Sequence, residues 1–253
     1  MATHPKNWFK SIWQTAAFYA AFLIFAVVGS LASVVCLIPA VLFRGARARG
    51  LGQRLIHALF RFYVGYLRAL GLVEVDARAL AELRAGGGLI VAANHPCLLD
   101  AVLLVAQMPQ AVCLMKGSLA RNIIFSGTAR LAGYVHNQSG LGLVKKCAAR
   151  LHEGAHLLVF PEGTRTVDGE LLPFKMGFAL VAVLSRAPVQ TILITAESGC
   201  LGKGRPLFQR PDFPLRYSLR LGARFQPEPG QDAKQFGGLV EKYFRETLSK
   251  NDA

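Results

Sequence analysis

The sequence predicts an α/β protein in which a largely parallel β-sheet is flanked by helices, with an N-terminal hydrophobic membrane-associating helical segment. From residue 73 onward, short runs of β-branched and apolar residues alternate with longer helical patterns, as in parallel strands joined by helices. Before residue 73 the chain is mostly apolar and has no acidic residue. At 253 residues, 53% of them hydrophobic, the chain suits one α/β domain plus an apolar appendage.

The alternating region is expected to form one catalytic domain over residues 73–253. Its runs of β-forming residues predict strands at 88–93, 111–115, 155–160, 189–195 and 215–223. The intervening patterns predict helices at 98–107, 118–132, 141–152, 176–185 and 231–249. Active sites in such sheets form where strands end and loops begin, so the loops after these strands are the first place to look for chemistry.

Residues 1–72 are expected to form N-terminal apolar and amphipathic membrane-associating helices. Residues 11–43 contain no charged side chain, and this segment is long enough to form a transmembrane helix. Pro39 and several small residues also permit a bend, so the segment could instead form a shallow helical pair. The next segment, 51–72, places Arg54, His57, Arg61 and Arg68 on one helical stripe. Such a helix either lies among lipid headgroups or packs on the domain with a solvated arginine face.

The charge distribution favours a membrane surface over nucleic acid as the partner. The net charge is +14, and eight lysines and arginines precede the first acidic residue, Glu74. Basic residues beside a long apolar segment are attracted to anionic lipids. Arginines follow the apolar segment, so the positive-inside rule predicts a membrane-associated protein on the cytoplasmic face of the inner (plasma) membrane. Five scattered cysteines without a Cys-x-x-Cys pair indicate a reducing compartment.

Two short strings carry the candidate chemistry. The first is Asn94-His95-Pro96-Cys97-Leu98-Leu99-Asp100, and the second is Phe160-Pro161-Glu162-Gly163-Thr164-Arg165. Each follows a predicted strand, so both are expected at the carboxyl edge of the sheet, facing one cleft. A turn into a helix would bring Asp100 back to His95, where the carboxylate fixes the imidazole tautomer and the imidazole acts as general base.

The two strings resemble motifs I and III of the glycerolipid and lysophospholipid acyltransferases, the family that includes 1-acylglycerol-3-phosphate O-acyltransferases. The resemblance, over residues 75–225, implies transfer of a fatty acyl group from acyl-CoA or acyl carrier protein to a hydroxyl of a lysophospholipid-like acceptor. It implies His95 and Asp100 as catalytic residues and no bound cofactor or metal. It also implies substrate binding by Lys116 and by the loop residues Glu162, Gly163, Thr164 and Arg165. Membrane lipids and acyl carrier protein are the expected partners.

The sequence departs from the family pattern at the second motif. The family carries an arginine shortly after a Gly and an apolar strand, whereas Gly133-Tyr134-Val135-His136-Asn137-Gln138 has none. The identity of the acceptor therefore stays open, with Lys145 or Lys146 as a substitute cation. Lys175 is either a further substrate-binding residue or an ordinary surface charge.

Three alternatives compete with this interpretation. His152-Glu153-Gly154-Ala155-His156 matches the zinc-protease pattern H-E-x-x-H, but Gly154 is expected to end a helix and His156 to begin a strand, so the imidazoles would diverge. Cys97 is a candidate nucleophile or a small residue filling a variable position. The last alternative is a non-catalytic membrane-surface protein that binds lipid with the acyltransferase fold.

Overall fold

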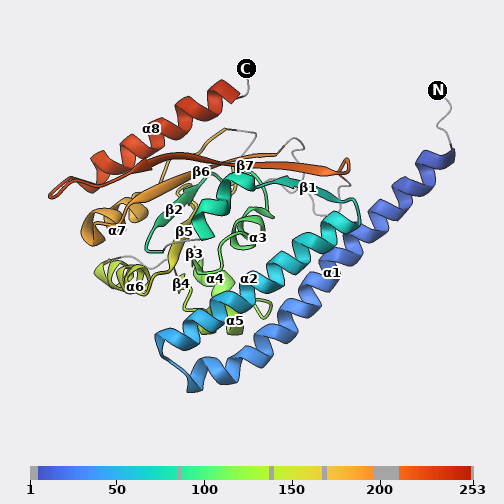
Figure 1. Ribbon diagram of the computed structural model, residues 1–253, viewed down its shortest axis with the longest axis horizontal. Helices are drawn as coiled ribbons and strands as arrows, with labels where there is room; N and C mark the ends of the chain where they lie inside the picture. Colours follow the sequence, from blue (N-terminus) through green and yellow to red (C-terminus); the bar gives the residue numbers. More distant parts are fainter. Residues whose placement is uncertain (1–4, 85–86, 137–139, 167–169, 197–210, 252–253) are drawn as a thin grey trace.

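A computed structural model describes residues 5–84, 87–136, 140–166, 170–196 and 211–251 of the chain (Figure 1). Within these residues, seven strands form one sheet in the order β1-β7-β6-β2-β5-β3-β4. The strands are β1 (Val73–Asp76), β2 (Ile90–Ala93), β3 (Ala111–Met115), β4 (Val135–His136), β5 (His156–Val159), β6 (Val189–Ala196) and β7 (Leu215–Phe225). All neighbouring strands are parallel except β6 and β7, which confirms the predicted largely parallel sheet.

Helices cover both faces of this sheet. They are α1 (Pro5–Leu42), α2 (Ala46–Ala69), the 3₁₀ helix η1 (Arg78–Arg84), α3 (Asp100–Val105), α4 (Gly117–Ala120), α5 (Ser126–Leu131), α6 (Leu141–His152), α7 (Gly177–Ser185) and α8 (Ala233–Asn251). Strand β2 shows the two-sided packing, because Val91 and Ala93 join the core under α2 and α3 while Ile90 and Ala92 join the core under α6, α7 and α8. Burial on both faces explains its uninterrupted apolar sequence.

The predicted elements differ from the structure in four places. Strand β4 was not predicted, because two residues are too short to show a pattern, and β1 was not predicted, because its four residues alternate apolar and acidic side chains and form no apolar run. The 3₁₀ helix η1 was not predicted either. The single helix expected at 118–132 is wrong: it is divided into α4 and α5. Asn122 lies at the break, and its side-chain carbonyl accepts a 2.9 Å hydrogen bond from the backbone N–H of Ile124, a local bond that competes with the helix.

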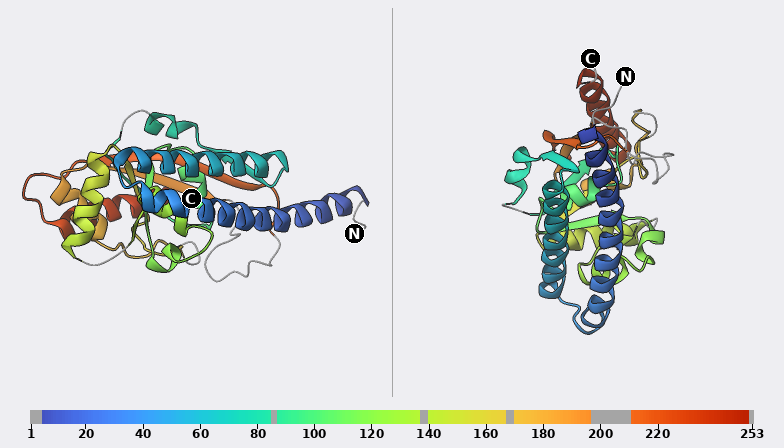
Figure 2. Two further views of the ribbon diagram at one scale, coloured as in Figure 1. Left: turned by 90° about the horizontal axis from the view of Figure 1, so that it is seen from below. Right: turned by 90° about the vertical axis from the view of Figure 1, so that its right-hand side faces the viewer.

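Helices α1 and α2 run side by side as a hairpin, and the N-terminal turns of α1 extend past the rest of the molecule (Figures 1 and 2). Residues 8–42 of α1 are long and apolar enough to cross a membrane. Yet one side of α1 is buried against the domain from residue 17 to residue 40, at Ala17, Phe18, Ala21, Ser33, Cys36 and Ala40. The opposite side carries a continuous row of exposed apolar side chains, including Leu31, Val35 and Ile38.

Helix α2 packs directly on the α/β domain. Its buried residues, among them Ile56, Tyr63 and Leu67, belong to the same core cluster as strand residues of the sheet. Of the predicted basic stripe, Arg54, Arg61 and Arg68 are exposed. His57 is not part of that solvent face, because its Nδ1 lies 2.9 Å from the backbone carbonyl oxygen of Val105. The hydrophobic core therefore continues across the expected boundary at residue 72.

A close helix crossing holds α1 against α5. The backbone N–H of Gly127 donates a 2.6 Å hydrogen bond to Ser33 Oγ. A Cβ atom at Gly127 would lie 1.8 Å from the Ser33 carbonyl oxygen, so only glycine permits this approach.

We expect Gly127→Val to push α1 away from α5 and to lower the free energy of unfolding by about 1–3 kcal/mol, the usual cost of overpacking. Gly142→Val is the matched control, because a Cβ at Gly142 meets no atom within 4 Å. Thermal unfolding of the two variants in detergent measures the difference. Equal melting temperatures would contradict the packing role of Gly127.

Candidate active site

His95 and Asp100 form a hydrogen-bonded pair at the carboxyl end of β2. The strand ends at Ala93 and α3 begins at Asp100, so the intervening turn returns the carboxylate to the imidazole. His95 Nδ1 lies 2.8 Å from Asp100 Oδ2. The same oxygen accepts a 2.7 Å hydrogen bond from the backbone N–H of Cys97. The structure thus brings together the two residues that the sequence places five positions apart.

Asp100 is fully buried, and this burial defines the electrostatics of the pair. Desolvation raises the pKa of the Asp100 carboxyl, the hydrogen bond to His95 opposes that rise, and the nearby charge of Glu162 adds to it. Asp100 Oδ1 is buried and has no hydrogen-bond partner among the described residues. The imidazole, by contrast, keeps 18% of its side chain exposed. Asp100 is therefore inaccessible to a substrate, and His95 is the member of the pair that a substrate can reach.

Glu162 connects the second string to the first. Its carboxylate is buried, and Oε1 accepts a 2.9 Å hydrogen bond from the backbone N–H of His95. It also accepts bonds from the hydroxyl of Thr166 and the backbone N–H of Leu172, each 3.1 Å long. In return, the backbone N–H of Thr166 donates to the His95 carbonyl oxygen at 2.8 Å. The Glu162 carboxylate is thus directed at the protein's own donors.

The ring of Phe160 stacks on the imidazole of His95. The ring centroids are 4.0 Å apart and the planes differ by 20°. Phe160 directly follows β5, the strand that pairs with β2, so adjacent strand ends deliver the two rings to the same place. Stacking fixes the plane of the imidazole, while the bond to Asp100 fixes its rotation within that plane.

Asn94 anchors the loop from the other side. Its side-chain amide pairs with the backbone of Ile194 on β6, donating to the carbonyl oxygen and accepting from the N–H, both at 2.8 Å. The side chain thereby continues the pairing of β2 and β6 beyond the last residue of β2. This is the point where the chain leaves the sheet and reaches His95.

The other predicted binding residues lie at neighbouring strand ends. Lys116 is exposed and directly follows β3, the strand beside β5. Gly163, Thr164 and Arg165 are partly buried in the loop after β5, and Gly163 has a φ of +68°, a conformation that favours glycine. Lys145 and Lys146 are exposed on α6, and Asn137 and Gln138 lie outside the described residues.

The two alternative chemistries lack suitable geometry. The Cys97 thiol is buried, with its Sγ 2.7 Å from the hydroxyl of Tyr217, so a substrate cannot reach it. His152 is the last residue of α6, whereas His156 lies in β5 with its Nε2 2.9 Å from the Leu83 carbonyl oxygen. The two imidazoles therefore do not share one helical face, as an H-E-x-x-H zinc site requires.

Sequence reasoning missed Phe160, Asn94 and Thr166 as residues that position His95. The only available signal was position, since Asn94 and Phe160 begin the two strings and Thr166 directly follows the second. Position in the sequence does not reveal that Phe160 stacks on His95. Nor does it reveal that the Asn94 side chain pairs with the backbone of Ile194, 100 residues away.

Comparison with known proteins agrees with this geometry. Residues 74–195 match the family model described as acyltransferase. A 1-acyl-sn-glycerol-3-phosphate acyltransferase of Helicobacter pylori is 32% identical over 130 residues, which cover 49% of this chain and 54% of that protein. The human 1-acyl-sn-glycerol-3-phosphate acyltransferase beta is 25% identical over 77% of this chain and 71% of its own length. The chain thus spans about half of the bacterial relative and more of the human one.

A solved structure shares the whole fold. The crystal structure of the 1-acyl-sn-glycerophosphate acyltransferase PlsC from Thermotoga maritima superposes with a TM-score of 0.70 and 22% identity over 97% of both chains. Residues 74–195, which include His95 and Asp100, therefore form an acyltransferase domain.

We expect Phe160→Leu to lower kcat for acyl transfer about three- to tenfold, because loss of the stacked ring frees the imidazole to tilt. Phe160→Tyr, which keeps the ring, should retain most of the rate. Phe178→Leu is the control, because it removes a ring from the core under α7 and α8 and not from His95. Steady-state kinetics on folded protein make the comparison, and an unchanged kcat for Phe160→Leu would exclude the positioning role.

Proposed function

We propose that the protein is a membrane-associated O-acyltransferase that transfers a fatty acyl group from an acyl thioester to a hydroxyl of a lysophospholipid-like acceptor. The observation that carries the proposal is the 2.8 Å pair of His95 Nδ1 and Asp100 Oδ2 at the carboxyl edge of the sheet. The H. pylori and human relatives are 1-acyl-sn-glycerol-3-phosphate acyltransferases, which supports the choice of acceptor class.

In the proposed mechanism, Asp100 accepts the Nδ1–H of His95, which leaves the lone pair on Nε2. Nε2 removes the proton of the acceptor hydroxyl as the oxygen attacks the thioester carbonyl carbon. The resulting imidazolium is stabilised by the Asp100 carboxylate, and its proton then passes to the departing thiolate. The acceptor hydroxyl is the nucleophile, so no acyl-enzyme forms and no cofactor takes part.

Lys116 and Arg165 are proposed to bind charge on the substrates. Both lie in segments that follow adjacent strands, β3 and β5. A lysine beside the reacting carbonyl stabilises the oxyanion of the tetrahedral intermediate. The planar guanidinium of Arg165 is suited to a phosphate of the acceptor, and Gly163 and Thr164 shape the loop that carries it.

An apolar cavity of about 290 Å³ supports a fatty acyl substrate. It lies between the helical hairpin and the domain, and its lining includes Val28 of α1, Phe60 of α2 and Met115, the residue before Lys116. We propose that it receives an acyl chain.

The donor thioester is acyl-CoA or acyl carrier protein. The net charge of +14 would attract the acidic carrier protein to the surface of the enzyme, and added salt would weaken this attraction.

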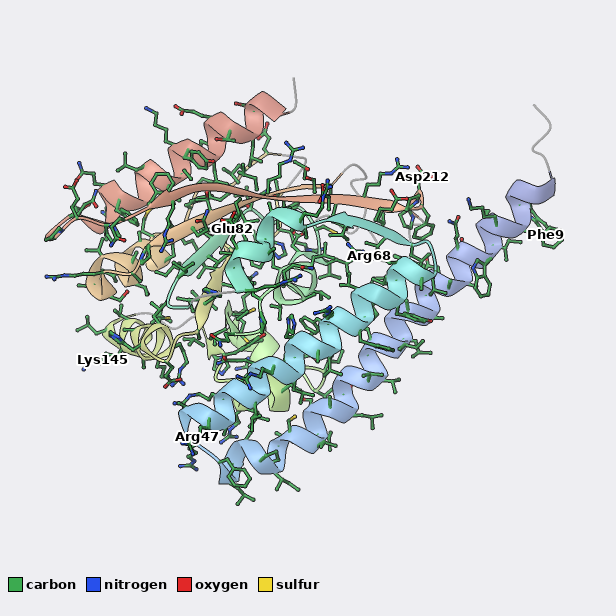
Figure 3. All side chains as sticks on the ribbon, in the orientation of Figure 1. Phe9, Arg47, Arg68, Glu82, Lys145 and Asp212 are labelled. Carbon is green, nitrogen blue, oxygen red and sulfur yellow. The ribbon has the colours of Figure 1, made fainter. Side chains whose placement is uncertain are left out.

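The packing of α1 supports attachment to one membrane leaflet and not a crossing. A spanning α1 would carry α2, which runs alongside it, into the hydrocarbon with exposed arginines from Arg47 to Arg68 (Figure 3). Burying each such charge in hydrocarbon costs several kcal/mol. We propose that α1 lies along the cytoplasmic face of the membrane, with its exposed apolar row in the lipid and the α2 arginines among anionic headgroups.

We expect His95→Ala to lower the rate of acyl transfer by at least about 10²-fold and Asp100→Asn to lower it strongly, because the first removes the base and the second its negatively charged partner. Single-turnover transfer from labelled acyl-CoA and acyl carrier protein into a panel of lyso-lipids measures both. If no pair of substrates reacts in the wild type, the non-catalytic lipid-binding alternative gains support.

We expect the triple substitution Leu31→Ser, Val35→Ser and Ile38→Ser to reduce cosedimentation with lipid vesicles without reducing stability, because all three side chains are exposed on α1. A control triple of exposed leucines on α7 and α8, Leu180→Ser, Leu184→Ser and Leu239→Ser, should leave vesicle binding unchanged. Equal binding by both triples would argue against the proposed attachment through α1.

A further inference from the structure

The positive charge of the chain lies in two segments that contain no acidic residue. Residues 1–73 contain eight lysines and arginines, and residues 101–152 contain six. Because neither segment contains an aspartate or a glutamate, the two together account for the whole net charge of +14. The second segment runs from α3 to the end of α6. The proposed attachment through α1 and α2 leaves most of its charge unexplained.

The two segments meet where the break between α4 and α5 packs on α1. Ile124 of the break lies against Gly29 of α1, since a Cβ atom at Gly29 would be 2.6 Å from Ile124 Cγ2. The ring of Phe125 lies 6.0 Å from the ring of Phe25, measured between centroids. The break and α2 lie on opposite sides of α1 (Figure 2). Basic segments therefore flank α1 on both sides.

Ile123 is the exposed apolar residue of this break. It is 63% exposed, whereas Ile124 and Phe125 turn toward α1 and line the apolar cavity. Two hydrogen bonds to Asn122 hold the turn. The backbone N–H of Ile124 donates to the Asn122 side chain at 2.9 Å, and the backbone N–H of Ser126 donates to the Asn122 carbonyl oxygen at 2.8 Å. The turn thus directs Ile123 outward beside α1.

Two exposed cations accompany Ile123. Arg121 precedes it by two positions, and Arg130 lies in the last turn of α5. Within the described residues, neither guanidinium takes part in an ion pair. An exposed apolar side chain among cations suits the boundary between hydrocarbon and anionic headgroups. An acidic protein would also attract the cations, but Ile123 lies beside the exposed apolar row of α1, which includes Val28 next to Gly29. This continuity favours the lipid surface.

We propose that the break between α4 and α5 is a second membrane contact, with Ile123 in the hydrocarbon and Arg121 and Arg130 on anionic lipid headgroups. The inference rests on the proposed function, because it assumes that the protein lies on one membrane leaflet. It gives the positive charge around α4 and α5 a partner. It also places Ile124 and Phe125, two wall residues of the cavity, next to the lipid from which an acyl chain would enter.

Tryptophan fluorescence tests the contact. Trp8→Phe and Trp13→Phe remove the two native tryptophans, and Ile123→Trp then introduces a single probe. Vesicles of phosphatidylglycerol and phosphatidylcholine with brominated acyl chains should quench this probe at least about twofold, because bromine quenches tryptophans that lie in the hydrocarbon. Leu239→Trp is the matched control, because Leu239 is an exposed residue of α8, which covers the opposite face of the sheet from α1. Equal quenching of the two probes would overturn the proposal.

A third probe, Leu31→Trp, separates failure of this inference from failure of the proposed attachment through α1. Quenching at Leu31 without quenching at Ile123 would keep α1 in the membrane and overturn the second contact. Quenching at Ile123 alone would support the second contact and show that attachment through α1 is wrong. Quenching at neither position would overturn both. None of these results depends on acyl transfer, which His95→Ala tests separately.

Removal of charge provides a second measurement. The double substitution Arg121→Ser and Arg130→Ser should lower the partition coefficient on phosphatidylglycerol vesicles about five- to thirtyfold and leave that on pure phosphatidylcholine vesicles unchanged. The control double, Arg224→Ser and Lys234→Ser, removes exposed cations from β7 and α8 and should change both values less than about twofold. An equal loss in the two doubles would overturn the proposal. Unchanged vesicle binding with a higher KM for acyl carrier protein would also overturn it, by assigning the cations to an acidic protein.

Discussion

The candidate active site depends on holding one short loop, Asn94 to Asp100, in a single conformation. The loop leaves β2, presents His95, and enters α3 at Asp100. Asn94 ties its start to β6, Glu162 and Thr166 bind the two backbone polar groups of His95, and Asp100 binds both the imidazole and the Cys97 N–H. The contacts from outside the loop come from β6 and from the loop after β5, and these segments meet the loop after β2 because β6, β2 and β5 are adjacent in the sheet.

This dependence explains why two strings sixty residues apart act as one unit. Phe160 and Glu162 are directed toward His95, one by stacking and the other by hydrogen bonding. The following residues, Gly163 to Arg165, continue past that contact and carry the loop to Lys175. The loop after β5 thus has one part that holds His95 and a second part, Gly163 to Arg165, that is proposed to bind substrate. A substitution in the first part would be expected to change kcat, and one in the second part KM.

Much of this arrangement was predictable from the sequence, for identifiable physical reasons. The strands β2, β3, β5 and β6 are mostly apolar runs, and β7 alternates apolar with polar residues. The position of His95 and Glu162 after two of the apolar runs predicted that they meet at one edge of the sheet. The sequence did not reveal that Glu162 is buried. In the resemblance it is a substrate-binding residue, and nothing in a single loop residue shows which donors its carboxylate will meet. The burial of one side of α1 was equally hidden, because Ala17, Phe18 and Ala21 look no different in sequence from the exposed apolar residues beside them.

The two buried carboxylates beside His95 lower the stability of the protein. Because stability does not account for them, we attribute their presence to function. Asp100 and Glu162 are 0% and 2% exposed, and the charge of Glu162 adds to the rise that burial causes in the pKa of Asp100. A protein selected for stability alone would have apolar side chains at two positions as deeply buried as these. The charge of Glu162 is compensated by three donors, whereas Asp100 retains one oxygen without a partner. The unpartnered oxygen, Oδ1, belongs to the same carboxylate whose Oδ2 contacts the imidazole. In the proposed mechanism the imidazole takes up a proton, and the buried Asp100 carboxylate then gains a cation beside it. The proposed proton transfer would therefore offset part of the electrostatic cost of burying Asp100.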